Sequence, residues 1–126
     1  MSIRTPLARA RNHGAAKDGV HHWWLQRLTA LALVPLVIWF VISVLGLVGA
    51  SHDQFVDWAS SPLVAALLIA LIAATFYHGA IGLQVVYEDY ISNHLRRLIA
   101  DVVTKFILGL LALVSVVAVL RLAVGG

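Results

Sequence analysis

A histidine, an aspartate and a tyrosine near the middle of the chain have the side chains that electron and proton chemistry needs. His78 stands inside a long apolar run, and Asp89 and Tyr90 follow where that run ends. An ionisable residue in a membrane span indicates a functional site, because its burial in hydrocarbon is costly. An imidazole can ligate a haem iron, a phenol can donate to a quinone carbonyl, and a carboxylate can relay protons. The three residues therefore predict a cofactor in the membrane and a polar ligand near its surface.

Each of these residues also has a purely structural interpretation. A histidine in a span can donate a hydrogen bond to a neighbouring helix, and a tyrosine at a helix end can belong to the aromatic belt. The positions three and four residues from His78 are mostly small, namely Ala74, Thr75, Ile81 and Gly82. Small residues leave room for a flat group, but they equally serve helix packing. The sequence therefore supports both interpretations of His78.

A haem bound at His78 requires a second chain. The other histidines lie outside the predicted spans or at their edges, at His13, His21, His22, His52 and His94. A six-coordinate haem therefore needs its second axial ligand from a partner. Arg27 lies one turn inside the membrane interface, where its guanidinium can meet haem propionates or lipid phosphates. The tandem His21-His22 is a weak metal signal, because adjacent residues of a helix do not share a face.

The composition places the chain in the membrane class. Of its 126 residues, 61% are hydrophobic and 12% are charged, whereas soluble domains have about half and about a quarter. The mean hydropathy is +0.92. The absence of cysteine excludes disulfides, thiolate-bound iron–sulfur clusters and covalent c-type haem from this chain. Its net charge of +3 comes from basic residues at the edges of apolar runs, which indicates membrane orientation and not nucleic-acid binding.

Three apolar runs are long enough to cross a bilayer. They lie within predicted spans at about 22–50, 62–88 and 102–124 of a single domain, 1–126. At about 1.5 Å per residue, each run covers the ~30 Å hydrocarbon core. We expect Pro35 to kink the first span, and Ser61-Pro62 to begin the second as N-cap and first helical residue. The predicted fold is an all-α membrane bundle of three helices that packs against a second membrane subunit.

The remaining segments are predicted to be irregular. Residues 1–19 are polar and basic and predict a loosely structured cytoplasmic tail. Residues 51–61 and 88–101 are predicted to be loops. A cleaved signal peptide is the alternative for the first span, although its apolar run is longer than the usual core of about 7–15 residues.

The distribution of lysine and arginine predicts the orientation. Five basic residues precede or begin the first span: Arg4, Arg9, Arg11, Lys17 and Arg27. The first loop has none, the second loop and its margin have three (Arg96, Arg97 and Lys105), and the C-terminal end has Arg121. Because basic residues stay inside, the N-terminus and the second loop are predicted to be cytoplasmic and the C-terminus external.

Together these features resemble a known family. His78 is followed after ten residues by Asp89-Tyr90, and Gly19-Val20-His21 is followed by Arg27-Leu28-Thr29-Ala30. Both patterns resemble the smaller hydrophobic membrane anchor subunit of succinate dehydrogenase (succinate:quinone oxidoreductase, complex II). Three spans, a cytoplasmic N-terminus and the chain length also match, so the resemblance covers nearly the whole chain.

The resemblance implies a role for each candidate residue. His78 would be one axial ligand of haem b, the other coming from the cytochrome b556 anchor subunit. His21 and Arg27 would lie near the haem propionates, and the neighbouring His22 leaves open which histidine approaches them. Tyr90 would hydrogen-bond the ubiquinone carbonyl, with Asp89 helping to organise that site. Glu88 adds a second acid, which can alter the proton route.

The function implied by the resemblance is that of an anchor in the respiratory chain and the tricarboxylic acid cycle. In the bacterial inner membrane, with its C-terminus periplasmic, it would dock the flavoprotein and iron–sulfur subunits on the cytoplasmic face. It would share haem b, help to form the ubiquinone site and oxidise no succinate by itself. Two alternatives remain: an anchor of fumarate reductase, and a cofactor-free structural or channel-like membrane protein.

Overall fold

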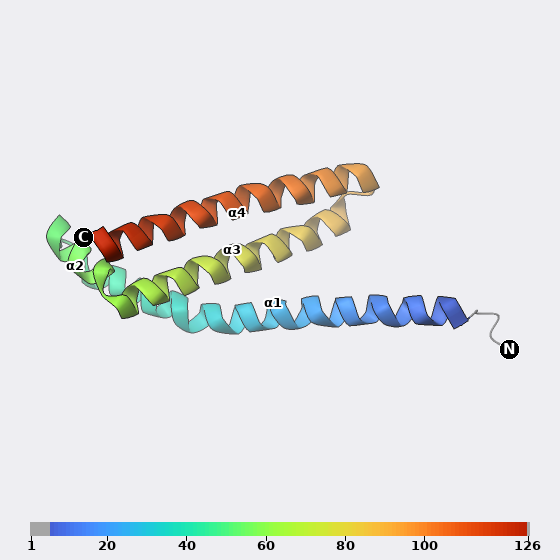
Figure 1. The fold of residues 1–126 in the computed structure, drawn as a ribbon, viewed down its shortest axis with the longest axis horizontal. Coiled ribbons are helices and arrows are strands. Elements are labelled where there is room, and N and C mark those ends of the chain that lie inside the picture. The colour runs from blue at the N-terminus through green and yellow to red at the C-terminus, as the bar shows by residue number, and fades with distance from the viewer. Residues whose placement is uncertain (1–5, 126) are drawn as a thin grey trace.

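All regular structure in the described part of the chain is helical. The computed structural model describes residues 6–125, with side chains from residue 19 onward. The helices in chain order are α1 (Pro6–Gly46), α2 (His52–Ser60), α3 (Pro62–Tyr90) and α4 (His94–Gly125) (Figure 1). Three of them are long and apolar enough to cross a membrane, over Gly19–Gly46 in α1 and over the whole of α3 and α4. The predicted all-α class with three membrane helices is confirmed.

The helix α3 is the centre of the bundle. It packs against α1 on one side and against α4 on the other, while within the described residues the backbones of α1 and α4 do not approach each other. The short α2 contacts α3 and α4 near the end of α4 (Figure 1). The start of α1 lies with the α3–α4 connection at one end of the bundle, and the C-terminus lies at the other (Figure 1). An odd number of crossings requires this arrangement of the termini.

The first connection contains a helix where a loop was predicted. The backbone N–H of Gln54 donates to Ser51 Oγ over 3.2 Å, and the N–H of Ser51 donates to Gln54 Oε1 over 2.9 Å. This capping box satisfies two of the backbone donors that a helix start leaves without partners, and α2 follows it. Gly49, with φ of +81°, makes the turn that precedes it. The prediction of an irregular 51–61 segment is therefore wrong.

The second connection is much shorter than predicted. Residues 91–93 alone join α3 to α4, in place of the predicted loop at 88–101. The reason is Asn93, whose side-chain oxygen accepts hydrogen bonds from the N–H groups of Leu95 (3.0 Å) and Arg96 (3.2 Å). Asparagine is a strong N-cap, so the helix begins directly after it in spite of the polar residues that follow.

The N-terminal segment is helical from Pro6, so the prediction of a loosely structured 1–19 tail is wrong for this part; residues 1–5 lie outside the described residues. Strong helix formers (four alanines, two arginines, one leucine and one lysine) make up eight of the 14 residues 6–19. Proline at the start of a helix loses no hydrogen bond, because the first N–H groups have no partner within the helix. In consequence α1 extends past the α3–α4 connection (Figure 1).

The two prolines within the predicted spans occupy different kinds of position. Pro62 is at the start of α3, as predicted, and Ser61 is its N-cap by position, although the Ser61 hydroxyl makes no capping hydrogen bond. Pro35 lies inside α1, which continues to Gly46. The kink expected at Pro35 stays a prediction.

The chain buries little of its own apolar surface. In the described part, the buried apolar residues are Ala59, Ala65, Ile81 and Val119, and no large side chain is fully enclosed. Large apolar residues face outward along all three membrane helices; Leu31 and Phe106, for example, are 69% and 76% exposed. An apolar surface of this extent requires lipid or another subunit as its neighbour.

A side-chain hydrogen bond ties α3 to α4. The Tyr87 and Thr104 hydroxyl oxygens lie 2.7 Å apart in a partly buried position. We expect Tyr87→Phe to destabilise the assembled protein by about 1 kcal/mol, because the threonine loses its partner while the ring packing stays. Thermal unfolding of Tyr87→Phe, Thr104→Val and the double variant checks this. The double variant should lose little more than either single one, and fully additive losses would contradict the pairing.

Candidate functional site

His78 lies on the α1 side of α3, where it meets a threonine. Thr29 Oγ1 is 3.0 Å from His78 Nδ1, and the contact is partly buried. The same hydroxyl lies 2.8 Å from the carbonyl oxygen of Leu25 and 3.0 Å from that of Gln26, both on its own helix. The contact joins α1 to α3 within their membrane spans. The predicted metal ligand is therefore held from a second helix.

Thr29 is the functional candidate to which the sequence alone assigns no role. It belongs to the motif that enters the first span, but its side chain resembles that of any threonine that hydrogen-bonds to its own helix. A polar residue between Leu28 and Ala30 is a weak signal by itself. Only the packing of α1 on α3 shows that this hydroxyl faces an imidazole.

One face of α1 continues in polar residues from Thr29 toward the start of the helix. His22, Gln26 and Thr29 follow each other at spacings of four and three residues, which place side chains on the same face. Gln26 Oε1 is buried and has no hydrogen-bond partner among the described residues. His21 is rotated by about 80° from Thr29 around the helix, whereas His22 is rotated by only about 20°. Of the two adjacent histidines, His22 therefore shares the face of Thr29.

Arg27 leaves α1 on a different face. Its guanidinium carbon is 5.1 Å from the ring centroid of Trp23, one turn earlier, which is a cation–π contact. The Trp23 ring in turn packs edge-on against Trp24, with 5.1 Å between centroids. Arg27 and Thr29 are two residues apart, a spacing that does not put side chains side by side. The structure thus brings Thr29, and not Arg27, to His78.

Asp89 and Tyr90 are the last residues of α3. Asp89 follows His78 by eleven residues, which places it about 20° from His78 around the helix and about 16 Å along it. Tyr90 is turned by about 120° from His78 and is 84% exposed. Asp89 is also exposed, and neither side chain has a hydrogen bond to another described residue. Both side chains are therefore accessible to a ligand or a partner.

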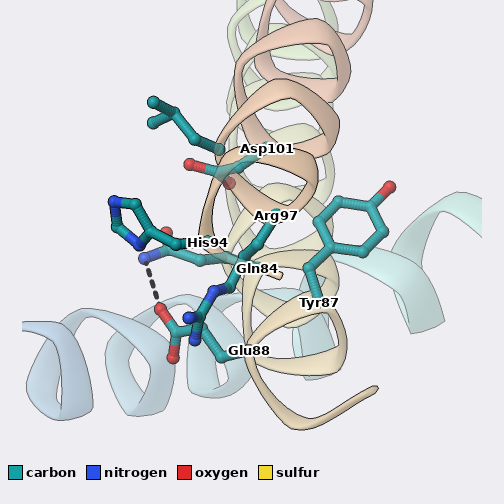
Figure 2. A pocket seen from close by; sticks show the side chains of 7 residues that line it. Gln84, Tyr87, Glu88, His94, Arg97 and Asp101 are labelled. Atoms are coloured by element: carbon teal, nitrogen blue, oxygen red, sulfur yellow. Dashed lines mark hydrogen bonds between the residues drawn. The ribbon is translucent and has the colours of Figure 1, made fainter. Parts of the chain in front are cut away.

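A polar groove between α3 and α4 opens at this end of the bundle (Figure 2). Its volume is about 360 Å³, and it is lined by Gln84, Tyr87, Glu88, His94, Arg97, Leu98 and Asp101. The Gln84 amide donates to Glu88 Oε1 over 3.1 Å, whereas the Tyr87 ring points away from the other side chains (Figure 2). Neither Asp89 nor Tyr90 lines the groove. The side chains of Glu88 and Gln84 lie on the α4 side of α3, whereas Asp89 lies on the same side of the helix as His78.

The polar groove gathers titratable groups that the sequence does not place together. Asp101 pairs with Lys105 through Oδ2 at 2.8 Å, while its Oδ1 is buried without a partner among the described residues. His94 and Arg97 face the same space from the first turn of α4. These residues of α4 lie against the end of α3 because the connection between the two helices, residues 91–93, is so short. The groove therefore brings Glu88, His94 and Asp101 together beside the end of the membrane span.

The surroundings of His78 suit one axial ligand of a haem. Nδ1 is occupied by the Thr29 hydroxyl, and Nε2 has no hydrogen-bond partner among the described side chains. No group of three or more His, Cys, Asp or Glu residues that could hold a metal ion occurs in the part of the chain that the structure describes. The partnerless oxygen of Gln26 lies one turn from Thr29 and can accept a hydrogen bond, so it would be satisfied by a donor and not by a haem propionate. His78 could therefore supply one axial ligand to a haem iron, and the second ligand would have to come from outside the described residues.

Comparison with known proteins identifies the family. Residues 1–120 match the family described as "Succinate dehydrogenase/Fumarate reductase transmembrane subunit". The chain is 35% identical over 105 residues to the succinate dehydrogenase hydrophobic membrane anchor subunit of Rickettsia bellii, covering 82% of this chain and 84% of the relative. The corresponding subunit of Paracoccus denitrificans is 26% identical over 126 residues, covering 99% and 96%. The chain therefore belongs to the family of succinate dehydrogenase and fumarate reductase transmembrane subunits, as its motifs predict.

Proposed function

We propose that this succinate dehydrogenase membrane anchor subunit supplies one axial ligand to a shared haem b and one side of a ubiquinone site. The observation that carries the proposal is an imidazole inside a membrane helix whose Nδ1 is engaged by the Thr29 hydroxyl. Ligating histidines commonly use one ring nitrogen for the metal and the other for such a partner. His78 Nε2 is then the ligand atom. The second axial ligand comes from the cytochrome b556 anchor subunit.

The polar face of α1 is the proposed neighbour of the haem propionates. An imidazole N–H of His22 and the amide N–H of Gln26 can both donate to a carboxylate, and both residues lie on the same face as Thr29. Arg27 is the charged partner that the family resemblance implies, but its side chain must leave Trp23 to reach this face. His21 lies off this face, so we favour His22 of the two histidines. The haem supplies one-electron storage when it is bound.

Tyr90 and Asp89 form this chain's part of the proposed quinone site. The Tyr90 phenol donates to a quinone carbonyl oxygen, and the Asp89 carboxylate relays protons beside it. Both side chains are exposed, so the remaining contacts come from the second anchor and the iron–sulfur subunit. Reduction of the quinone to the quinol takes up two electrons and two protons. These protons reach Asp89 directly from water, because its side chain is exposed and lies outside the polar groove.

We place the N-terminus of this inner-membrane protein in the bacterial cytoplasm and its C-terminus in the periplasm. The first turn of α4, with Arg96 and Arg97, lies at the same end as the start of α1, whereas α2, with Asp53 and Asp57, lies at the opposite end (Figure 1). Basic residues are retained on the cytoplasmic side. The flavoprotein and iron–sulfur subunits then dock beside Tyr90.

Purification of the complex through a tag on this chain tests the proposal. We expect the flavoprotein, the iron–sulfur subunit and a second anchor to co-purify. The dithionite-reduced minus oxidised spectrum should show b-type haem, and succinate should reduce ubiquinone. A colourless preparation without dehydrogenase subunits would instead support the cofactor-free alternative. Preferential oxidation of quinol by fumarate would indicate a fumarate reductase anchor.

A further inference from the structure

We infer that Thr29 is a positioning residue for His78, whose hydroxyl selects the imidazole tautomer with the proton on Nδ1 and the lone pair on Nε2. The inference rests on the proposed function, because it concerns the imidazole that is proposed to bind haem iron. The contact between Thr29 and His78 across two helices is the observation that supports it.

The single proton of the Thr29 hydroxyl decides the tautomer. Three polar atoms surround this hydroxyl: the carbonyl oxygens of Leu25 at 2.8 Å and Gln26 at 3.0 Å, which only accept, and His78 Nδ1 at 3.0 Å, which donates or accepts according to the tautomer. A hydroxyl has one donor and two acceptor lone pairs. If the proton points to a carbonyl, the oxygen can accept a second hydrogen bond from a protonated Nδ1. The hydroxyl then makes two hydrogen bonds.

The opposite tautomer makes fewer hydrogen bonds. If the hydroxyl proton points to an unprotonated Nδ1, no proton lies between Thr29 Oγ1 and the Leu25 carbonyl oxygen 2.8 Å away. Two oxygen atoms then face each other at hydrogen-bond distance. In the low dielectric of a membrane span such a lost hydrogen bond is more costly than in water. The geometry therefore favours Nδ1–H and leaves the Nε2 lone pair for iron.

Thr29 also constrains the plane of the imidazole ring. Its hydroxyl is bonded to the backbone of α1, and a β-branched side chain has few χ1 rotamers in a helix. His78 belongs to α3, so rotation of its ring breaks a contact between two packed helices. Thr29 therefore acts on the ligand's orientation without touching the iron.

Loss of this hydrogen bond should change the haem electronically. A ligand imidazole that donates through Nδ1–H is a stronger base at its metal-bound nitrogen. A stronger base stabilises the oxidised iron more than the reduced iron. Thr29→Val keeps the shape of the side chain but removes the acceptor. We therefore expect this substitution to raise the haem midpoint potential and to lower haem affinity about tenfold.

The experiment compares variants of the complete complex, purified with all its subunits. Redox titration, electron paramagnetic resonance and haem stoichiometry are measured for Thr29→Val, Thr29→Ala and Thr29→Ser. Thr29→Ser keeps the hydroxyl and should restore the wild-type potential and low-spin signal. Ser43→Ala is the matched control, because it removes a hydroxyl of the same helix four turns away and should match the wild type.

The outcomes separate the inference from the proposed function. A wild-type potential and low-spin signal in both Thr29→Val and Thr29→Ala would overturn the inference and leave the haem proposal intact. If Thr29→Ser behaved like Thr29→Val, the methyl group and not the hydroxyl would be responsible, and the inference would also fail. Thr29→Ala supplies the result if valine prevents assembly. A wild-type complex without haem would overturn both.

Discussion

His78→Ala is expected to abolish the low-spin b-type haem signal of the purified complex. The iron loses one of two axial ligands, and the other histidines with described side chains lie at or beyond the ends of the spans. Loss of an outer partner of a metal ligand lowers affinity about 10–100-fold, so loss of the ligand itself should cost at least that much. The reduced minus oxidised spectrum and the haem-to-protein ratio measure the effect. Haem that remains should be five-coordinate and high-spin.

His94→Ala is the matched control for this prediction. His94 is also a histidine of a membrane helix, but it lines the polar groove on the α4 side of α3. Its variant should retain haem at the wild-type ratio. A six-coordinate spectrum that survives His78→Ala would make His78 a packing residue. The Thr29 contact would then be an ordinary hydrogen bond between helices.

Tyr90→Phe is expected to lower the turnover of ubiquinone reduction about 100-fold, because it removes one hydrogen-bond donor from the oxygen that gains charge. The side chain is 84% exposed, so its hydroxyl contributes little to the fold of this chain. Succinate oxidation with a soluble dye as acceptor should remain at the wild-type rate. The ratio of the two activities in the same preparation is the measurement.

Tyr87→Phe is the control for the quinone prediction. It removes the same phenolic hydroxyl one turn earlier, but that hydroxyl faces Thr104 on α4. The variant should reduce ubiquinone normally in spite of its lower stability. If Tyr87→Phe lost quinone reduction while Tyr90→Phe kept it, the quinone would bind on the α4 side of α3, at the polar groove.

The sequence predicts the membrane helices well because span length and hydropathy are local properties. The sequence-based prediction fails where individual capping residues start a helix in a segment whose polar composition predicts a loop. Ser51 and Gln54 cap the start of α2, and Asn93 caps the start of α4, within segments whose composition is typical of loops. Each cap satisfies backbone N–H groups that would otherwise have no partner at a helix start. These capping residues can be read in the sequence, but their effect depends on which helix follows them.

In the candidate site, too, some residues can be predicted from the sequence, whereas the roles of others depend on how the helices pack. His78 is conspicuous in sequence, because an ionisable residue within an apolar run is rare. The role of Thr29 depends on how α1 packs against α3, which no local pattern states. The separation of Asp89 from the polar groove follows from helix rotation, once α3 is known to continue through Tyr90. From composition alone, this helix is predicted to end at about residue 88, two residues before its end in the structure.

The unbroken course of α3 from Pro62 to Tyr90 restricts which changes of chain length the protein tolerates. One inserted residue between His78 and Asp89 would rotate everything beyond it by about 100° and lengthen the path by about 1.5 Å. Tyr90 would then face another neighbour, although each side chain of the site would still be present. The spacing of ten residues in this segment is therefore as much a part of the site as the residues themselves. Length variation is accommodated far more easily in the short connection at 91–93, outside the helix.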